Sequence, residues 1–244
     1  MLQKTKGIVL RSIKYGDTSL ITTIFTDLYG IQAYMVQGVR SAKSRNNKAG
    51  LLQPATLLDL IVYHKPQQSL QRVREYQASY LYTSIQEEVI KNSIALFSVD
   101  LLSRLLPESA PMPELFEFVN EYFTALDRML LEEVANFPIF FIVHCSKVLG
   151  YNINGEYSID TPYLNLKEGA FTSNPPLISP VIHDEDAKSL NELLHVQEFA
   201  RLKDIEMNAA MRYRLLDWYI EYLHQHTQHL GVIKSLAVLQ AILH

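Results

Sequence analysis

A cluster of positive charge between residues 38 and 48 has the clearest chemical meaning in this sequence. It contains four cationic side chains and no acidic one: Arg40, Lys43, Arg45 and Lys48. Arg and Lys side chains neutralise phosphates whatever the base sequence, and the Ser and Asn residues between them can donate hydrogen bonds to phosphate oxygens. The segment therefore predicts a site for a nucleic-acid backbone, with a solvated connection that binds nothing as the alternative.

Further positive charge and several aromatic side chains accompany this segment in the first 77 residues. Arg72 and Arg74 are two positions apart, so we expect them on one face of a strand, together with Leu70 and Tyr76. Proteins that bind single strands combine cations with aromatic rings on which bases stack, although such rings can equally pack inside a barrel. Further cations near the start of the chain are Lys4, Lys6, Arg11 and Lys14, and the aromatic side chains are Tyr15, Phe25, Tyr29, Tyr34, Tyr63 and Tyr76.

The two parts of the chain carry opposite net charges. Residues 1–77 contain eleven Lys or Arg against four Asp or Glu, a net charge of +7, and the remainder carries −11. The whole-chain value of −4 hides this difference. Such asymmetry is expected where a part that binds a polyanion is joined to a part that does not.

The sequence contains no motif of a common enzyme class. We find no phosphate-binding glycine loop, nucleophile elbow, HExxH or repeated carboxylate pattern, so we predict no catalytic residue. The acids Glu132–Glu133 and Asp184–Asp186 keep a metal-dependent nuclease as an alternative, although acids also favour helix N-termini. His224 and His226 would point to nearly opposite sides of a helix, so we expect no metal site with His229.

The chain is expected to fold without covalent or metal support. Its 244 residues are 48% apolar, enough for one large or two small cores. The single cysteine, Cys145, permits neither an internal disulfide nor a multi-cysteine zinc cluster, and we expect a buried, inert thiol. The apolar run from Pro138 to Val143 is too short to span a membrane. We therefore expect a cytoplasmic protein.

Hydrophobic periodicity predicts five strands in residues 1–78. Apolar and polar residues alternate around Ile8 and Leu10 and again between Ile31 and Met35. A long polar connection follows from Gly38 to Pro54, and five strands with one long loop favour an OB-fold barrel over a sandwich. The other strands are expected at Leu20–Thr26, Thr56–Tyr63 and Leu70–Tyr76.

From residue 79 the hydrophobic period becomes that of an α-helix. Phe137–Leu149 is apolar nearly all round and is followed by Gly150, which predicts a buried central helix. Residues 151–180 lose the periodicity, so we expect an irregular segment with a hairpin around Lys167–Gly169. The fold class is therefore α+β, with an OB-fold in residues 1–78 and a helical domain in residues 79–244. Other helices are expected at Ile90–Leu105, Leu115–Leu126, Asp184–Leu194, Met207–Tyr222 and Ser235–Leu243.

Several short motifs resemble those of the bacterial RecO family in order and spacing. The pair Gly38-Val-Arg40 and Lys43-Ser-Arg45, preceded by the opening strand Lys6–Arg11, is the most specific part of the resemblance. Leu149-Gly-Tyr151 and Lys234-Ser235 extend it sparsely toward the end of the chain. The other matching segments are Tyr15-Gly-Asp17, Ile24-Phe-Thr26, Tyr29-Gly30 and Leu52-Gln-Pro54.

This resemblance implies a mediator of DNA repair and homologous recombination that is not an enzyme. It implies binding of single- and double-stranded DNA and annealing of complementary strands. The expected partners are RecR and the C-terminal tail of single-strand DNA-binding protein, with which the protein would load the RecA recombinase onto coated DNA. The resemblance assigns DNA binding to Arg11, Arg40, Lys43 and Arg45, and charge alone adds Lys48, Arg72 and Arg74.

Two features of the helical part leave open questions. Many family members hold a four-cysteine zinc module after the Leu-Gly-Tyr motif, but residues 152–176 contain no cysteine. We therefore predict no bound zinc and a segment held by packing alone. An OB-fold that binds structured RNA is an alternative to DNA binding. No motif locates a pocket for the acidic tail, so the candidates are the cations available there: Arg104, Arg128, Lys147, Arg212 and Arg214.

Overall fold

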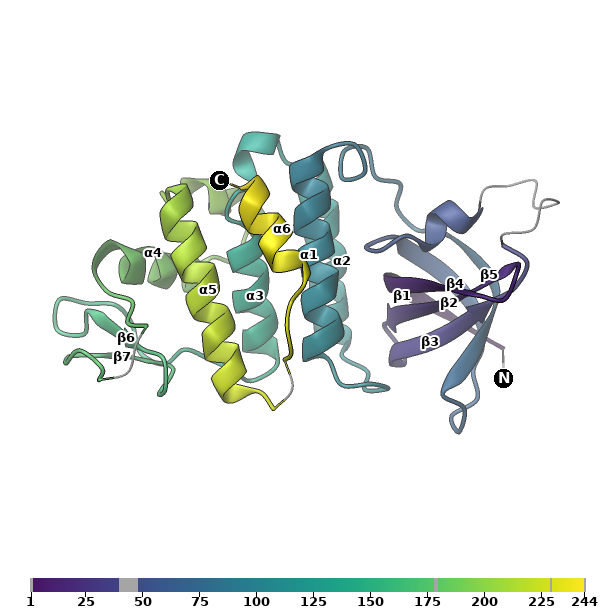
Figure 1. Ribbon diagram of the computed structural model, residues 1–244, viewed down its shortest axis with the longest axis horizontal. Coiled ribbons are helices and arrows are strands. Elements are labelled where there is room, and N and C mark those ends of the chain that lie inside the picture. The colour runs from purple at the N-terminus through teal and green to yellow at the C-terminus, as the bar shows by residue number, and fades with distance from the viewer. Residues whose placement is uncertain (1, 40–47, 178–179, 229, 244) are drawn as a thin grey trace. The chain divides into compact units, whose positions relative to one another are not determined.

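The computed structural model describes residues 2–39, 48–177, 180–228 and 230–243, and the chain divides into two compact units (Figure 1). The first unit comprises residues 1–87 and 99–127, and the second comprises residues 88–98 and 128–244. Helix α1 (Val89–Leu105) therefore contributes residues to both units. None of the helices in the described ranges is long and apolar enough to cross a membrane.

The first unit is built on a closed barrel of five strands (Figure 1). The strand order is β1-β2-β3-β5-β4, and neighbouring strands are antiparallel except β3 and β5, which run parallel over a short stretch. This confirms the prediction of a five-stranded OB-fold barrel. The strands are β1 (Leu2–Tyr15), β2 (Ser19–Thr26), β3 (Gly30–Val36), β4 (Leu57–Tyr63) and β5 (Leu70–Ala78).

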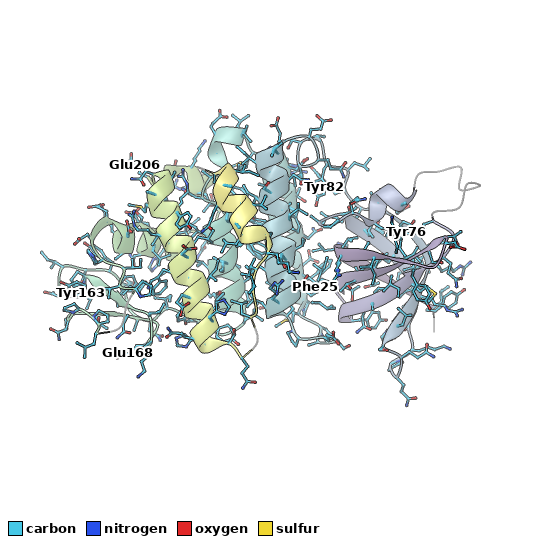
Figure 2. All side chains as sticks on the ribbon, viewed as in Figure 1. Phe25, Tyr76, Tyr82, Tyr163, Glu168 and Glu206 are labelled. Atoms are coloured by element: carbon cyan, nitrogen blue, oxygen red, sulfur yellow. The ribbon has the colours of Figure 1, made fainter. Side chains whose placement is uncertain are left out.

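The barrel interior is filled by apolar side chains from all five strands. Tyr34 is the largest side chain of this core, and Val73 and Tyr76 of β5 pack against it from the wall. Figure 2 labels the partly buried Tyr76 and the fully buried Phe25. The buried core consists of Val9, Leu20, Ile24, Tyr34, Val36, Leu52, Leu58, Leu60 and Val62.

Two β-bulges change which side chains face the outside of the barrel. In β1 the pairing with β2 skips Leu10, so Ile8, Val9 and Leu10 are all buried and the predicted alternation breaks there. In β5 the pairing with β4 skips Arg74. The expectation that Leu70, Arg72, Arg74 and Tyr76 share one face is therefore wrong, because the extra residue turns Tyr76 toward the core.

Helix α2 (Pro113–Arg128) belongs with the barrel up to Asp127. The ring of Phe116 meets that of Phe25 edge-on at 5.5 Å, and the N–H of Ser109 donates to the carbonyl of Ile31 over 3.1 Å. A Cβ on Gly30 would collide with the carbonyl oxygen of Ala110. This approach requires a glycine, which also has a φ of +64°.

The second unit is helical, as predicted. Its central helix α3 (Phe137–Val148) buries side chains on every face, including Cys145. The predicted hairpin is present as β6 (Tyr163–Asn165) and β7 (Ala170–Thr172), and Figure 2 labels Tyr163 and Glu168 within it. The remaining α-helices are α4 (Asp184–His195), α5 (Ala209–His226) and α6 (Ser235–Ile242), and short 3-10 helices lie at Leu131–Glu133 and Phe199–Asp204.

Three side chains on one face of α5 bind the irregular segment of residues 151–180. The indole N–H of Trp218 donates to the carbonyl of Pro180 over 3.2 Å, and the hydroxyl of Tyr222 donates to the carbonyl of Asn152 over 3.1 Å. Nε2 of His226 lies 3.2 Å from the carbonyl oxygen of Leu166. Since positions four apart share a helix face, these residues form a ladder that ties the segment to α5.

Candidate nucleic-acid interface

The predicted phosphate-binding loop is only partly described. Arg40, Lys43 and Arg45 lie outside the described residues, and Lys48 begins a 3-10 helix that runs to Leu52. The residues on both sides of the gap are attached to the barrel, because Val39 and Leu51 pack against its core. Val39 and Leu51, which flank the charged segment, are therefore held at the barrel wall.

Arg11 projects from the outer wall of the barrel. The bulge in β1 places it opposite Thr23 of β2, which pairs in turn with Ala33 of β3. Directly paired residues point to the same side of a sheet, so all three belong to the outer face. Arg11 is exposed, and it forms no ion pair with any described residue. Its charge is available to a phosphate group.

Arg72 lies in a second row of outward side chains. It pairs with Met35 of β3 on one side and with Tyr63 of β4 on the other. Ile21 and Ile13 continue this row across β2 and β1. Arg72 is exposed without an ion pair in the described part of the chain, and Tyr63 is 46% exposed. A free guanidinium beside an accessible ring and apolar side chains suits an unstacked nucleotide chain.

Arg74 differs from Arg72 although both are exposed. It is the extra residue of the bulge, and its Nε lies 3.2 Å from a carboxylate oxygen of Glu75. Lys4 and Lys6 also have acidic neighbours, because they line one pocket with Asp59 and Glu75. These three cations are partly neutralised by the barrel itself, so they are weaker phosphate sites than Arg11 and Arg72.

The aromatic side chains of the barrel divide into core and surface groups. Phe25 and Tyr34 are fully buried, and burial raises the pKa of the Tyr76 hydroxyl to about 12. Tyr29 stacks on His64 with ring centroids 3.8 Å apart. Tyr15 and Tyr63 are the two that remain about half exposed. Of the six aromatic side chains in the barrel, only Tyr15 and Tyr63 therefore offer an open surface on which a base can stack.

Our sequence reasoning missed a cation in the connection between β4 and β5. Lys65 is exposed, and it precedes the polar run Gln67, Gln68 and Ser69. Its side chain forms no ion pair within the described ranges. The basic character of this short connection could have been noticed in the sequence, but the hydrogen bonds that hold the Lys65 backbone to Gln71 depend on the fold.

The five cations proposed to meet an acidic partner have different surroundings. Arg104 pairs with Asp100 at 2.9 Å, and Arg214 forms two hydrogen bonds of 2.7 Å with the carboxylate of Asp186. Arg128 and Lys147 are exposed. The two paired arginines are already neutralised, so they are the least suited of the five to bind a further anion.

Arg212 is the cation best placed to receive a carboxylate. It lines a small apolar groove between α3, α5 and α6, with Pro138, Leu216 and Leu239. One Nη donates to the carbonyl of Met207, but the buried Nε has no partner in the described structure. Burial lowers the pKa of this guanidinium. A buried donor without an acceptor is costly, so a carboxylate that reached this Nε after the groove opened would relieve it.

The acids that suggested a nuclease are held in local interactions. Glu133 forms an ion pair with Lys203 at 2.8 Å and accepts a hydrogen bond from the N–H of Leu130. Asp186 is held by Arg214, and Asp184 lies 2.6 Å from Nδ1 of His183. Within the described ranges, no three His, Cys, Asp or Glu residues are grouped as metal ligands.

Comparison with known proteins covers both parts of the chain. Residues 1–82 match the family model described as "Recombination protein O N terminal", and residues 86–236 match "Recombination protein O C terminal". A Bacteroides fragilis protein named DNA repair protein RecO is 33% identical over 243 residues, and one from Phocaeicola vulgatus with the same name is 30% identical over 242. Both alignments cover 99% of this chain and 99% of the relative.

Proposed function

Because the chain belongs to the RecO family of DNA repair proteins, we propose that its barrel binds single- and double-stranded DNA. The observation that carries this proposal is the outer wall of the barrel. There Arg11 and Arg72 are exposed and unpaired among the described residues, the half-exposed ring of Tyr63 lies next to Arg72 in the strand pairing, and Tyr15 at the end of β1 is also half exposed. Cations supply affinity for phosphates, and rings supply affinity for unstacked bases.

The proposed activity is annealing and mediation without bond making or breaking. Neutralising the phosphates of two complementary strands removes the repulsion that keeps them apart, so their bases can pair. With RecR, the protein would then help to load RecA onto DNA coated by single-strand DNA-binding protein. Support for these partners comes from the family alone, and we assign no residue to RecR.

We expect loss of the barrel cations to weaken binding of single-stranded DNA. Changing Arg11 and Arg72 together to Ala should lower affinity about tenfold near physiological salt, and changing Arg40, Lys43, Arg45 and Lys48 should lower it about a hundredfold. The slope of log affinity against log salt should flatten by about 0.7 for each phosphate that the variant no longer neutralises. Fluorescence anisotropy with a labelled oligonucleotide at several salt concentrations measures both quantities.

The matched control for the strand variant is Lys4→Ala with Lys6→Ala. It removes the same charge from the same barrel, but from a pocket that also contains Asp59 and Glu75. We expect a smaller change, within about threefold of the wild type. Equal losses for both pairs would mean that only net charge matters, and equal binding by all variants would refute the proposed site.

We further propose that Arg212 receives the terminal carboxylate of the acidic tail of single-strand DNA-binding protein. Arg212→Ala should weaken binding of a synthetic tail peptide about tenfold or more, because a hydrogen-bonded charge pair at a desolvated site is removed. Arg214→Ala, two positions away, should change affinity less than about threefold, since Asp186 already neutralises Arg214. Isothermal titration calorimetry would reject this assignment if the two variants bound alike.

A further inference from the structure

An open pocket of about 430 Å³ lies on the barrel wall in front of Arg72. Its volume is within the range of sites that hold small molecules, roughly 300–1,000 Å³. Met35 of β3 and Leu70 of β5 supply apolar surface, and Arg72 supplies the charge. The connection between β4 and β5 completes the lining with Gln67, Gln68 and Ser69, and no acidic residue lines the pocket in the described structure.

Gln71 holds this connection in place. The side chain is 1% exposed, and its Oε1 accepts a hydrogen bond of 2.9 Å from the N–H of Lys65. Its Nε2 donates to the carbonyl of Lys65 over 2.8 Å and to the carbonyl of Gln68. One buried amide therefore fixes both ends of the run Lys65–Gln68. The main chain at the pocket edge is therefore ordered before any ligand arrives, which lowers the entropic cost of binding.

The lining matches the chemistry of a nucleotide. Met35 and Leu70 can contact the flat face of a base, and the amides of Gln67 and Gln68 can donate to and accept from its polar edge. Arg72 can bind the adjoining phosphate, and the exposed ring of Tyr63 lies next to it in the strand pairing. We propose that this pocket holds one unstacked nucleobase of single-stranded DNA, with the neighbouring phosphate on Arg72.

A larger pocket on the same barrel does not fit this ligand. It has a volume of about 760 Å³ and lies across β1, β4 and β5, where Lys4 and Lys6 are opposed by Asp27, Asp59 and Glu75. The three carboxylates would repel a phosphate that approached the two lysines. The absence of acids around Arg72 among the described residues therefore distinguishes the two pockets, and it selects the smaller one for a nucleotide.

A base in this pocket must be free of its stacking neighbours. Bases within a duplex have both faces covered, so the pocket would favour single strands and the ends of duplexes. The inference rests on the proposed binding of DNA by the barrel. It adds that the protein contacts bases as well as backbone, which phosphate contacts alone do not require.

The test compares an oligothymidylate with an abasic oligonucleotide that has the same number of phosphates. The wild type should bind the base-containing strand more tightly. Met35→Ala should weaken that binding about three- to tenfold and leave the abasic strand unaffected, since only a stacking surface is removed. Arg72→Ala should weaken binding of both strands and flatten the salt dependence. Arg74→Ala is the matched control, because Arg74 is an exposed cation of β5 that does not line the pocket.

The possible results separate this inference from the function on which it rests. If the wild type binds both strands equally, or if Met35→Ala weakens both to the same extent, there is no base pocket although DNA binding stands. If the wild type binds neither strand, both proposals fail. Gln68→Ala gives an independent check on the polar edge and should also act only on the base-containing strand. Circular dichroism and urea unfolding establish that each variant is folded.

Discussion

Replacing Asp127 with Ala is expected to lower the free energy of unfolding by about 2–4 kcal/mol, because several hydrogen bonds to one charged group are lost together. Asp127 lies near the end of α2 and is 3% exposed. Its carboxylate accepts hydrogen bonds from the main-chain N–H groups of Thr83, Ser84 and Ile85, at 3.0, 2.8 and 3.0 Å. The hydroxyl of Tyr80 donates to it as well. Truncation would leave these donors, of which the N–H of Ile85 is buried, without this acceptor.

Urea unfolding followed by circular dichroism measures the loss. The matched control is Asp100→Ala, which removes a half-buried carboxylate that pairs with Arg104 within one helix. Such helical ion pairs contribute roughly 0.3–0.5 kcal/mol, so this variant should be close to the wild type. Asp127→Asn should lie between the two, because it keeps the size but loses the charge. A loss of less than about 1 kcal/mol in the free energy of unfolding of Asp127→Ala would contradict this role of the Asp127 hydrogen bonds.

The same carboxylate should make stability depend on acid pH. Burial raises the pKa of Asp127, but the hydrogen bonds from Thr83, Ile85 and Ser84 outweigh burial and lower the pKa to about 2. A carboxyl group with a lowered pKa in the folded state stabilises the fold above its ordinary value of 3.8. This stability, roughly 2 kcal/mol, is lost as the pH falls from about 4 toward 2. The wild type should lose more stability over this range than Asp127→Asn.

The barrel was predictable from sequence because each strand has one buried face, which imposes a period of two. The two bulges were not predictable, since one extra residue reverses the facing of every later side chain without changing the composition. The bulge in β1 determines that Arg11 is outward, and the bulge in β5 separates Tyr76 from Arg72. The bulges therefore change which cations face outward, but they leave the five-stranded topology unchanged.

The sequence could not distinguish the cations of the helical part from one another. Arg212 and Arg214 are two positions apart on α5, yet Arg214 is paired with Asp186 from α4 and Arg212 lies in an apolar groove. The pocket beside Arg72 was missed for a related reason. It is formed by β3, β5 and the connection before β5, which meet through the short parallel pairing of β3 and β5. Such tertiary juxtapositions leave no local pattern.

Replacing Trp218 with Ala is expected to lower the free energy of unfolding of the second unit by about 3–5 kcal/mol. The side chain is fully buried, stacks on Tyr222 with ring centroids 5.7 Å apart, and holds the carbonyl of Pro180 through its N–H. Trp218→Phe keeps most of the ring but removes the donor, so it should cost about 1–3 kcal/mol. Circular dichroism is the appropriate probe, because the chain has no other tryptophan to report by fluorescence.

The ladder on α5 also makes a prediction about local opening of the irregular segment. Lys167 adjoins Leu166, whose carbonyl oxygen lies near His226, and the tryptic bond after Lys167 is in the hairpin that the ladder holds. If the ladder holds this segment in place of the four-cysteine zinc module of other family members, Trp218→Ala and Tyr222→Phe should both speed cleavage after Lys167 under native conditions. Tyr222→Phe is the stricter case, since it removes one hydrogen bond and leaves the stacking intact. Cleavage after Lys167 at the wild-type rate in both variants would mean that packing of β6 and β7, rather than the ladder, retains the segment.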